Sequence, residues 1–396
     1  MAHIPFYNYI IAGGGASGLA LLWQLMSHRK KLGNPSILLV DQNLGAESTS
    51  KTWCFWEREH LPYPELIHHS WKHLEVRHRQ SMITLTPQRH GYHCISSNPF
   101  RNYILEKARQ SDNVTLLESP IEELRYCEED KTPKAITADG TFRAEWIFQS
   151  CFRPPKPGHA LETMPLKQHF LGWEVQLNRP LLDEKTATFM DFDVEQQPDG
   201  MSFMYVLPFR PTRALFEYTV FGRKLAAEEV YKEQIRSYLY KRLGLREKDY
   251  RVVRSEQGVI PMTDRKFPGR HAKRILNIGI GGGTAKPSTG YSFMRAHKHA
   301  AEIVQNLVRK KDPAPFSSPY RYRVYDLQLL HILYHHPKKS VGIFDALFRN
   351  NPIDRLLDFL AEESSLAQDL AVMNSVPYGP FLRALNAVKG RIVMGR

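Results

Sequence analysis

The feature that most constrains the fold is a glycine-rich turn near the start of the chain, Gly13-Gly14-Gly15-Ala16-Ser17-Gly18. The apolar run at residues 7–12 predicts a buried strand before the turn. The apolar spacing over residues 19–30 predicts a helix after it. This is a G-x-G-x-x-G motif between a strand and a helix, the order that a dinucleotide-binding unit of the Rossmann type requires.

Each position of this motif has a physical role in binding a pyrophosphate. Gly13 makes the tight turn, Gly15 lets the phosphates approach the backbone, and Gly18 lets the helix pack closely on the strand. The first N–H groups of the helix, beginning at Ala16, carry partial positive charge toward the phosphates. We therefore expect Gly13, Gly15, Ala16 and Gly18 to bind the cofactor.

A second apolar strand, residues 36–40, ends in Asp41. An acidic residue about 20 positions beyond the glycines is placed to accept hydrogen bonds from an adenosine ribose. Asp41 is thus a candidate cofactor ligand, although a surface carboxylate at a strand end remains the alternative.

A second glycine cluster follows the predicted strand at residues 275–280, and a helix pattern follows over residues 292–308. A dinucleotide unit at the start of a chain of this length is common in FAD-binding proteins. Backbone N–H groups of the second loop can bind the ribityl and pyrophosphate part of the same FAD. A plain glycine-rich connection is the alternative. The candidate cofactor residues here are Gly279, Gly282, Gly283, Thr289 and Gly290.

The middle of the chain is rich in aromatic and β-branched residues. It reads as strands at residues 172–176, 187–192, 202–209 and 214–221, with turns near 198–200 and 211–212. This pattern predicts an antiparallel sheet inserted between the two parts of the dinucleotide domain. Such a sheet could cover a substrate pocket.

Glu217 is the unusual residue of that sheet, because alternation places it on one strand face with Leu215, Thr219 and Phe221. If this face is inward, burial raises the pKa of the carboxyl and makes it a Brønsted acid. A solvated glutamate on an edge strand explains the same spacing equally well. The sequence leaves both readings open.

Charge and cysteine content narrow the classes of partner. Lys and Arg (54) exceed Asp and Glu (41) by 13, which favours polyanions such as an anionic membrane surface or a phosphate-bearing cofactor. No nucleic-acid-binding motif accompanies the charge. The cysteines are widely spaced, which predicts neither a metal site nor a disulfide framework and fits a reducing, cytoplasmic location. They are Cys54, Cys94, Cys127 and Cys151.

The long uncharged stretch at residues 4–27 resembles a signal or spanning segment. However, no basic segment precedes it and three glycines interrupt it, so we interpret it as part of the dinucleotide fold. No later stretch reaches the ~20 apolar residues that a membrane span needs.

The complete pattern predicts an α/β chain. Its predicted parts are a Rossmann-like FAD-binding domain at 1–65, 100–150 and 255–312, and an inserted antiparallel β-sheet substrate domain at 66–99 and 151–254. A helical C-terminal region follows at 313–396. Apolar residues such as Phe344, Phe348 and Leu360 recur there at helical spacing. They could form either a tunnel wall with a membrane-facing surface or ordinary core.

The chain resembles the lycopene cyclase family, in its bacterial β-cyclase form, over nearly its whole length. The dinucleotide motif is shared by many families, whereas the later stretches are more specific. The matching segments are residues 13–18 with Asp41, 52–56 (TWCFW), 168–174 (QHFLGWE), 205–208 (YVLP), 215–219 (LFEYT), 260–262 (IPM) and 286–293 (KPSTGYSF).

The resemblance implies an enzyme that converts lycopene or another acyclic carotenoid to β-ring products, γ-carotene and β-carotene, without net oxidation. Reduced FAD would stabilise a carbocation, and NAD(P)H would only reduce the flavin. Glu217 matches the family's likely acid, but Tyr218 stands where the family has a second glutamate, so one acid remains at this motif. Gly279-Ile280 lacks the Gly-Asp of flavoprotein hydroxylases, which favours a cyclase.

Aromatic faces would stabilise the cation further. The candidates are Trp53, Phe55, Trp56, Trp173, Phe203 and Tyr205, although for each of them taken singly ordinary core packing is the better explanation. Because the implied substrate is a hydrocarbon, we expect a peripherally membrane-associated protein. The alternatives are an FAD- and NAD(P)H-dependent monooxygenase or prenyl reductase of similar fold, and a carrier that binds a prenyl or carotenoid chain without chemistry.

Overall fold

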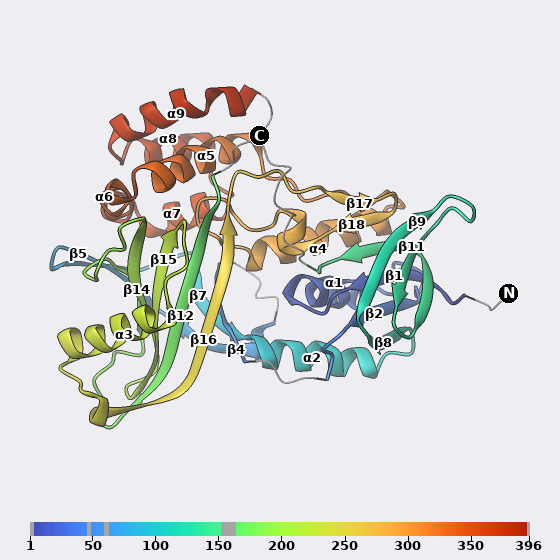
Figure 1. Ribbon diagram of the computed structural model, residues 1–396, viewed down its shortest axis with the longest axis horizontal. Coiled ribbons are helices and arrows are strands. Elements are labelled where there is room, and N and C mark those ends of the chain that lie inside the picture. Colours follow the sequence, from blue (N-terminus) through green and yellow to red (C-terminus); the bar gives the residue numbers. More distant parts are fainter. Residues whose placement is uncertain (1–3, 46–48, 59–62, 152–163, 394–396) are drawn as a thin grey trace.

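The computed structural model describes residues 4–45, 49–58, 63–151 and 164–393. Two large β-sheets lie side by side, and helices cover their faces and one end (Figure 1). The described part of the chain begins in the first sheet, and its last helix lies at the top of the view (Figure 1).

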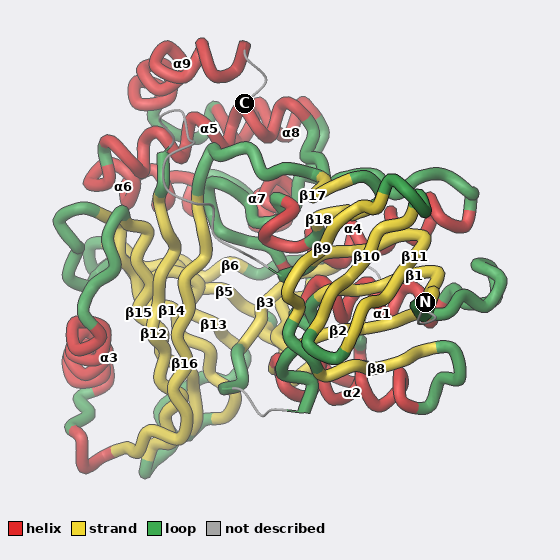
Figure 2. The backbone as a smooth tube through the Cα atoms, turned by 45° about the vertical axis from the view of Figure 1, so that its right-hand side comes forward, coloured by secondary structure: helices red, strands yellow, loops and turns green. Residues whose placement is uncertain are grey.

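The first sheet is the predicted dinucleotide unit. Its main order is β17-β18-β11-β1-β2-β8, and the pairs from β18 to β8 are parallel, as in a Rossmann-like fold. The hairpin of β9 and β10 joins this sheet through β11 (Figure 2). The strands are β1 (Phe6–Ala12), β2 (Ile37–Asp41), β8 (Val114–Glu118), β9 (Ile121–Cys127), β10 (Thr132–Thr137), β11 (Gly140–Gln149), β17 (Arg270–Ala272) and β18 (Ile275–Asn277).

Three helices cover one face of this sheet, and their apolar residues join those of β1, β2 and β11 in one core. The glycine turn leads from β1 directly into the first of them, so the predicted order of strand, turn and helix is confirmed. The helices are α1 (Ala16–Ser27), α2 (Ser97–Arg109) and α4 (Phe293–Val308).

The second sheet has the order β16-β12-β15-β14-β13-β5-β6. The predicted antiparallel pairing holds except between β5 and β13, which are parallel. These two strands come from segments more than 100 residues apart, so no hairpin fixes their direction. The strands are β5 (His73–His78), β6 (Ser81–Leu85), β12 (Leu166–Leu177), β13 (Thr186–Asp191), β14 (Gly200–Arg210), β15 (Arg213–Gly222) and β16 (Tyr250–Met262).

The two faces of the second sheet carry different cores. On the outer face, α3 (Glu228–Leu243) packs on β12 and β15. The inner face packs against a three-stranded sheet and the C-terminal helices. These elements are β3 (Thr52–Glu57), β4 (Ile67–Trp71), β7 (Gly91–Ser96), α5 (Tyr320–His335), α6 (Pro337–Arg349), α7 (Ile353–Leu360), α8 (Leu366–Met373) and α9 (Tyr378–Val393). The predicted helical C-terminal region is therefore present.

The division of the chain into domains stays a prediction. Strand β16 runs across the predicted boundary at residue 255 and pairs with β12 of the second sheet. Likewise β3 and β7, which the predicted division places in different domains, pair with each other.

A candidate acid-base site between two sheets

The two sheets, the three-stranded sheet and the C-terminal helices enclose a cavity of about 520 Å³. One end of it is formed by glycine turns and the other by apolar and aromatic side chains. Its volume falls in the ~300–1,000 Å³ range of small-molecule sites. The cavity therefore joins the predicted cofactor end and the predicted substrate sheet in one space.

The glycine end of the cavity is formed where two turns meet. Gly15, Ala16 and Ser17 line it from the start of α1, and Gly279 lines it from the second glycine loop. A Cβ added at Gly15 would meet no atom within 4 Å, so the backbone there is open to a ligand. A Cβ at Gly279 would lie 2.7 Å from Oγ of Ser17, so glycine lets the two turns approach. Thr289 and Gly290 line the same cavity.

The other predicted glycines shape this end without lining the cavity. Gly13 has φ +108°, and a Cβ at Gly18 would lie 2.0 Å from the carbonyl oxygen of Gly13. Close packing of helix on turn thus requires glycine at these positions. Gly282 similarly lies against the carbonyl of Asn277, and Gly283 has φ +89°.

Asp41 stands at the end of β2 and accepts a hydrogen bond from the backbone N–H of Gly14 at 2.6 Å. It is half-buried, and its other oxygen accepts the N–H of Asn43 at 2.8 Å. Each carboxylate oxygen keeps a further lone pair, so Asp41 can still bind a ribose hydroxyl.

These residues fit a dinucleotide. The first turn of α1 contains no acidic residue and its cap Gly15 offers no side-chain acceptor, so its N–H groups are available to phosphate. Among the described residues, Oε1 of Gln168 is buried without a hydrogen-bond partner, and this side chain lines the cavity. It offers an acceptor to a ligand N–H.

The loop at residues 286–291 is anchored to the C-terminal helices. Nζ of Lys286 lies 3.0 Å from Asp326 and 2.9 Å from Glu362, and Oγ of Ser288 donates to Asp326 at 2.6 Å. Both side chains are buried. Lys286 therefore fixes the loop to α5 and to the end of α7.

Glu217 lies in the middle of the second sheet, on β15 between β12 and β14. Pairing places Glu256 of β16, Gly172 of β12, Glu217 and Tyr205 of β14 side by side across four strands. We call these four residues the carboxylate row. Glu256, Glu217 and Tyr205 all line the cavity, and Gly172 places no side chain between the two glutamates.

The environment of Glu217 favours the protonated acid. The residue is only 7% exposed, and the hydroxyl of Thr219 donates to its Oε1 at 2.9 Å. Burial first, and the nearby Glu256 carboxylate second, raise the pKa of Glu217 to about 8, while hydrogen bonding from Thr219 and the charge of Arg254 oppose the rise. Of the two readings that the sequence left open, the inward one is correct, and the edge-strand reading is wrong.

Glu256 is the residue that sequence reasoning missed. It is buried, and its carboxylate accepts hydrogen bonds from the N–H of Thr52 at 3.0 Å, the hydroxyl of Thr52 at 3.1 Å and the guanidinium of Arg254. Burial raises its pKa, and Arg254 and Thr52 act against that rise. The signal available in the sequence was alternation along residues 254–260, where Glu256, Gly258 and Ile260 share a face.

The predicted aromatic residues divide between the cavity and the core. Trp53, Trp56, Phe203 and Tyr205 line the cavity, and Trp56 stacks on Tyr291 with ring centroids 4.5 Å apart. Phe55 does not line the cavity and is fully buried against Phe293.

Trp173 does not face the cavity. Its neighbour Gly172 lies on the same sheet face as Glu217, since a Cβ there would be 3.3 Å from Cβ of Glu217. Strand alternation therefore turns Trp173 to the outer face, where it joins the core under α3 and lies 5.4 Å from the Arg236 guanidinium. Tyr218 faces the same way, and its hydroxyl donates to the carbonyl of Glu195 at 2.7 Å. A carboxylate at position 218 would thus point away from the cavity.

The C-terminal helices contribute Phe344, Phe348 and Leu360 to the cavity wall, while Leu356 and Leu357 belong to the buried core. The C-terminal helices therefore form part of the cavity wall and also part of the core. The indole N–H of Trp56 donates to the carbonyl of Leu357 at 3.1 Å and fixes α7 beside the cavity.

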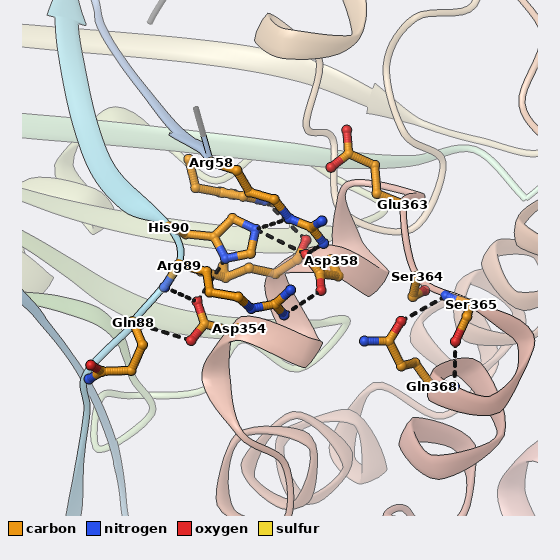
Figure 3. A network of polar contacts seen from close by, with 12 residues as sticks. Arg58, Gln88, Arg89, His90, Asp354, Asp358, Glu363, Ser364, Ser365 and Gln368 are labelled. Carbon is orange, nitrogen blue, oxygen red and sulfur yellow. Dashed lines mark hydrogen bonds and ion pairs between the residues drawn. The ribbon is translucent and has the colours of Figure 1, made fainter. Parts of the chain in front are cut away.

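An ionic cluster around the buried side chains of His90 and Asp358 holds α7 against the strands (Figure 3). Nδ1 of His90 lies 2.8 Å from Asp354, and Nε2 lies 3.0 Å from Asp358. Arg58 and Arg89 also bind Asp358. We call Arg58, Arg89, His90, Asp354 and Asp358 the His90 cluster.

Comparison with known proteins agrees with this geometry. Residues 8–386 match the model of a family described as lycopene cyclase protein. A lycopene beta-cyclase of Pantoea ananas is 25% identical over 303 residues, covering 73% of this chain and 72% of that protein. A lycopene beta-cyclase of Paracoccus sp. (strain N81106 / MBIC 01143) is 31% identical over 144 residues, covering 35% and 36%.

Solved structures share the fold at low identity. A geranylgeranyl bacteriochlorophyll reductase-like protein of Thermoplasma acidophilum has a TM-score of 0.61 and 12% identity, covering 98% of this chain and 100% of that one. The flavin-dependent brominase Bmp2 has a TM-score of 0.60 and 12% identity, with the same coverage. Because the family model spans nearly the whole sequence, this chain belongs to the lycopene cyclase family.

Proposed function

We propose that the protein is a lycopene β-cyclase that closes β-rings on lycopene or another acyclic carotenoid by proton transfer, without net oxidation. The observation that carries the proposal is the position of Glu217, a buried carboxyl with a raised pKa in an aromatic cavity that continues to the glycine turns. Related proteins described as lycopene beta-cyclases support the substrate class.

In this proposal Glu217 donates its proton to the terminal double bond of the polyene. The ring closes on the resulting carbocation, and loss of a neighbouring proton forms the ring double bond, so substrate and product are isomers. A group with a pKa near the working pH is suited to such a transfer.

The cavity walls serve the cation in two ways. The apolar side chains from β14, β15, α6 and α7 exclude water, which would otherwise add to the cation. The faces of Trp53, Trp56, Phe203 and Tyr205 offer cation–π stabilisation, each about 0.5–2 kcal/mol.

We propose FAD as the dinucleotide, held by Gly15, Ala16 and Gly279, with Thr289 and Gly290 beside it and Asp41 at the ribose. The fold likeness to flavin-dependent enzymes supports this choice. Bound in its reduced form, FAD would supply an electron-rich ring that stabilises positive charge in the adjacent substrate. NAD(P)H would be needed only to reduce the flavin.

A hydrocarbon substrate also implies contact with a membrane, and we propose a peripheral association. None of the described helices is long and apolar enough to cross a bilayer. The formal charge of +13 favours an anionic surface.

The test is expression of the full chain in a bacterial host that accumulates lycopene, followed by chromatography and mass analysis of the pigments. We expect lycopene to be replaced by cyclic isomers of unchanged mass. A product of changed mass, formed with stoichiometric NAD(P)H use, would identify a monooxygenase or reductase instead. Unchanged lycopene that co-purifies with the protein would indicate a carrier.

A further inference from the structure

The two glutamates of the carboxylate row occupy equivalent positions on either side of Gly172. Both pair with this residue, Glu217 through β15 and Glu256 through β16. Two strand spacings separate their Cα atoms by about 10 Å, and both side chains point into the cavity. A Cβ at position 172 would lie 3.3 Å from Cβ of Glu217, so only glycine leaves this space free.

The two carboxyl groups differ in the donors around them. Glu217 accepts one hydrogen bond, from Thr219, whereas Glu256 accepts three, one of them from a guanidinium. Arg254 is held in place by Glu174, 2.8 Å away, which in turn binds Arg213. Donors and a cation stabilise the ionised form, so a single proton shared by this pair resides on Glu217.

The remaining titratable groups facing the pair do not alter this assignment. Among the described residues, the other ionisable side chains that line the cavity are tyrosines, a cysteine and a lysine. They are Tyr92, Tyr205, Tyr291, Cys54 and Lys51. Burial raises the pKa of Tyr92, Tyr205 and Tyr291, so they stay neutral.

We propose that Glu256 is a positioning residue for the reaction: its negative charge, stabilised by Arg254 and Thr52, keeps the transferable proton on Glu217. This inference rests on the proposed function. Before transfer, the charges of Glu256 and Arg254 cancel. After transfer, the pair carries one additional negative charge, which balances the carbocation in the cavity. The proton lost as the ring double bond forms returns to the pair, so no proton is consumed overall.

The experiment compares the pH dependence of cyclisation by the flavin-loaded protein and its Glu256→Gln variant. For the unchanged protein, the rate should fall as the pH rises through about 8, because Glu217 loses its proton there. Removing the neighbouring negative charge lowers the pKa of Glu217, so the fall should occur at lower pH in the variant. Its rate at pH 8 should drop at least tenfold, with most activity kept near pH 6. Glu256→Asp should restore much of the original profile.

The matched control is Asp191→Asn, which removes a fully buried carboxylate of the same sheet that binds a different arginine, Arg242, and does not line the cavity. The pH dependence of cyclisation by this control variant should match that of the unchanged protein. A Glu256→Gln profile that does not move would overturn the proposal, and so would loss of activity at every pH in a folded variant, because Glu256 would then act directly.

Infrared spectroscopy separates this inference from the proposed function, since it needs no turnover. The carbonyl stretch of a protonated carboxylic acid should titrate near pH 8, disappear in Glu217→Gln, and titrate at lower pH in Glu256→Gln. If the band shows these three responses while no carotenoid is cyclised, the proposed interaction of Glu256 with Glu217 is supported and the proposed substrate is wrong. An unshifted band would contradict the pair itself.

A second observation concerns the outer surface of α8 and α9, which lie at the top of the molecule away from the sheets (Figure 1). Large apolar side chains are exposed there at helical spacing, between 38% and 63%. They are Leu366, Leu370, Tyr378, Leu382 and Leu385. Arg383 and Lys389 are exposed beside them.

The exposed charges that α8 and α9 contribute to this surface are positive. The only acidic residue in the sequence between 364 and 393 is Asp369, and it is fully buried, where it binds Arg321 and Ser364. We infer that this α8–α9 surface docks on an anionic lipid membrane. Apolar side chains would enter the interface while the cations meet lipid phosphates.

Co-sedimentation with lipid vesicles tests this inference without reference to catalysis. The protein should bind phosphatidylcholine vesicles that contain phosphatidylglycerol, and binding should weaken with salt. The variant Leu370→Glu with Leu382→Glu should lose at least tenfold in binding. Leu225→Glu, a matched control at an exposed leucine elsewhere, should bind normally. Equal binding by all three, or a dimer in sedimentation analysis that the double variant dissociates, would overturn the inference.

Discussion

The carboxylate row and the His90 cluster both bury ionisable side chains, but they satisfy them very differently. In the His90 cluster, Asp358 is fully buried and contacts two arginines and a histidine. In the carboxylate row, Glu217 is nearly as buried, yet it accepts a single hydrogen bond and faces a cavity.

This difference separates a structural role from a chemical one. A buried charge that is paired on every side is costly to break and holds its elements together. A buried carboxyl with few partners keeps its proton and can give it away. The His90 cluster therefore fixes α7 beside the cavity, and the carboxylate row is available for proton transfer inside it.

The two regions also respond to pH in opposite directions. The pKa of Glu217 is raised to about 8, so its contribution to stability is complete below 4.5 and is lost as the pH rises through 8. For Asp354, burial alone would raise the pKa, but bonds from His90 and two backbone N–H groups hold it below 3.8. Its contribution is present above 3.8 and is lost as the pH falls below that value.

The largest expected effect comes from Glu217→Gln. The amide fills the same space but has no acidic proton, so we expect cyclisation to fall by about 10²–10⁴-fold, the range for loss of a general acid. Folding should be unaffected at low pH and improved above pH 8, because a poorly solvated charge is removed. Pigment formation and the thermal midpoint, measured at pH 6 and pH 9, check both parts.

Glu217→Asp is the conservative comparison, because it keeps an acid but withdraws it by one methylene. It should retain weak activity. If Glu217→Gln cyclised lycopene at the original rate, the carboxylate row would lose its chemical role, and its contrast with the His90 cluster would disappear.

Local pattern was sufficient for much of the fold and part of the site. The dinucleotide motif predicted β1, α1 and β2 because its glycines, the strand and the helix are adjacent in sequence. Alternation along residues 214–221 grouped Glu217 with Leu215, Thr219 and Phe221, and all four line the cavity.

The other features of the site depend on contacts between segments that are distant in the sequence. Glu256 meets Glu217 only through the register of β16 on β12 and of β12 on β15, which no local pattern encodes. The same register turns Trp173 outward, because Gly172 occupies the inward position. His90 and Asp358 are nearly 270 residues apart in sequence, so their contact could not be inferred from spacing.

The smaller expected effect is on stability, from Asp358→Asn in the His90 cluster. The amide is neutral, so the buried His90 and the partly exposed Arg58 and Arg89 lose a charged partner. Because both arginines can regain water, we expect a loss of about 2 kcal/mol in the free energy of unfolding, near that of a charged hydrogen bond. Asp112→Asn, at an exposed pair with Arg29, should cost less than about 1 kcal/mol. Urea unfolding measures both. Cyclisation per folded molecule should stay close to normal in Asp358→Asn. A large loss of activity at unchanged stability would show that the His90 cluster takes part in the reaction, and it would contradict the distinction between the two regions.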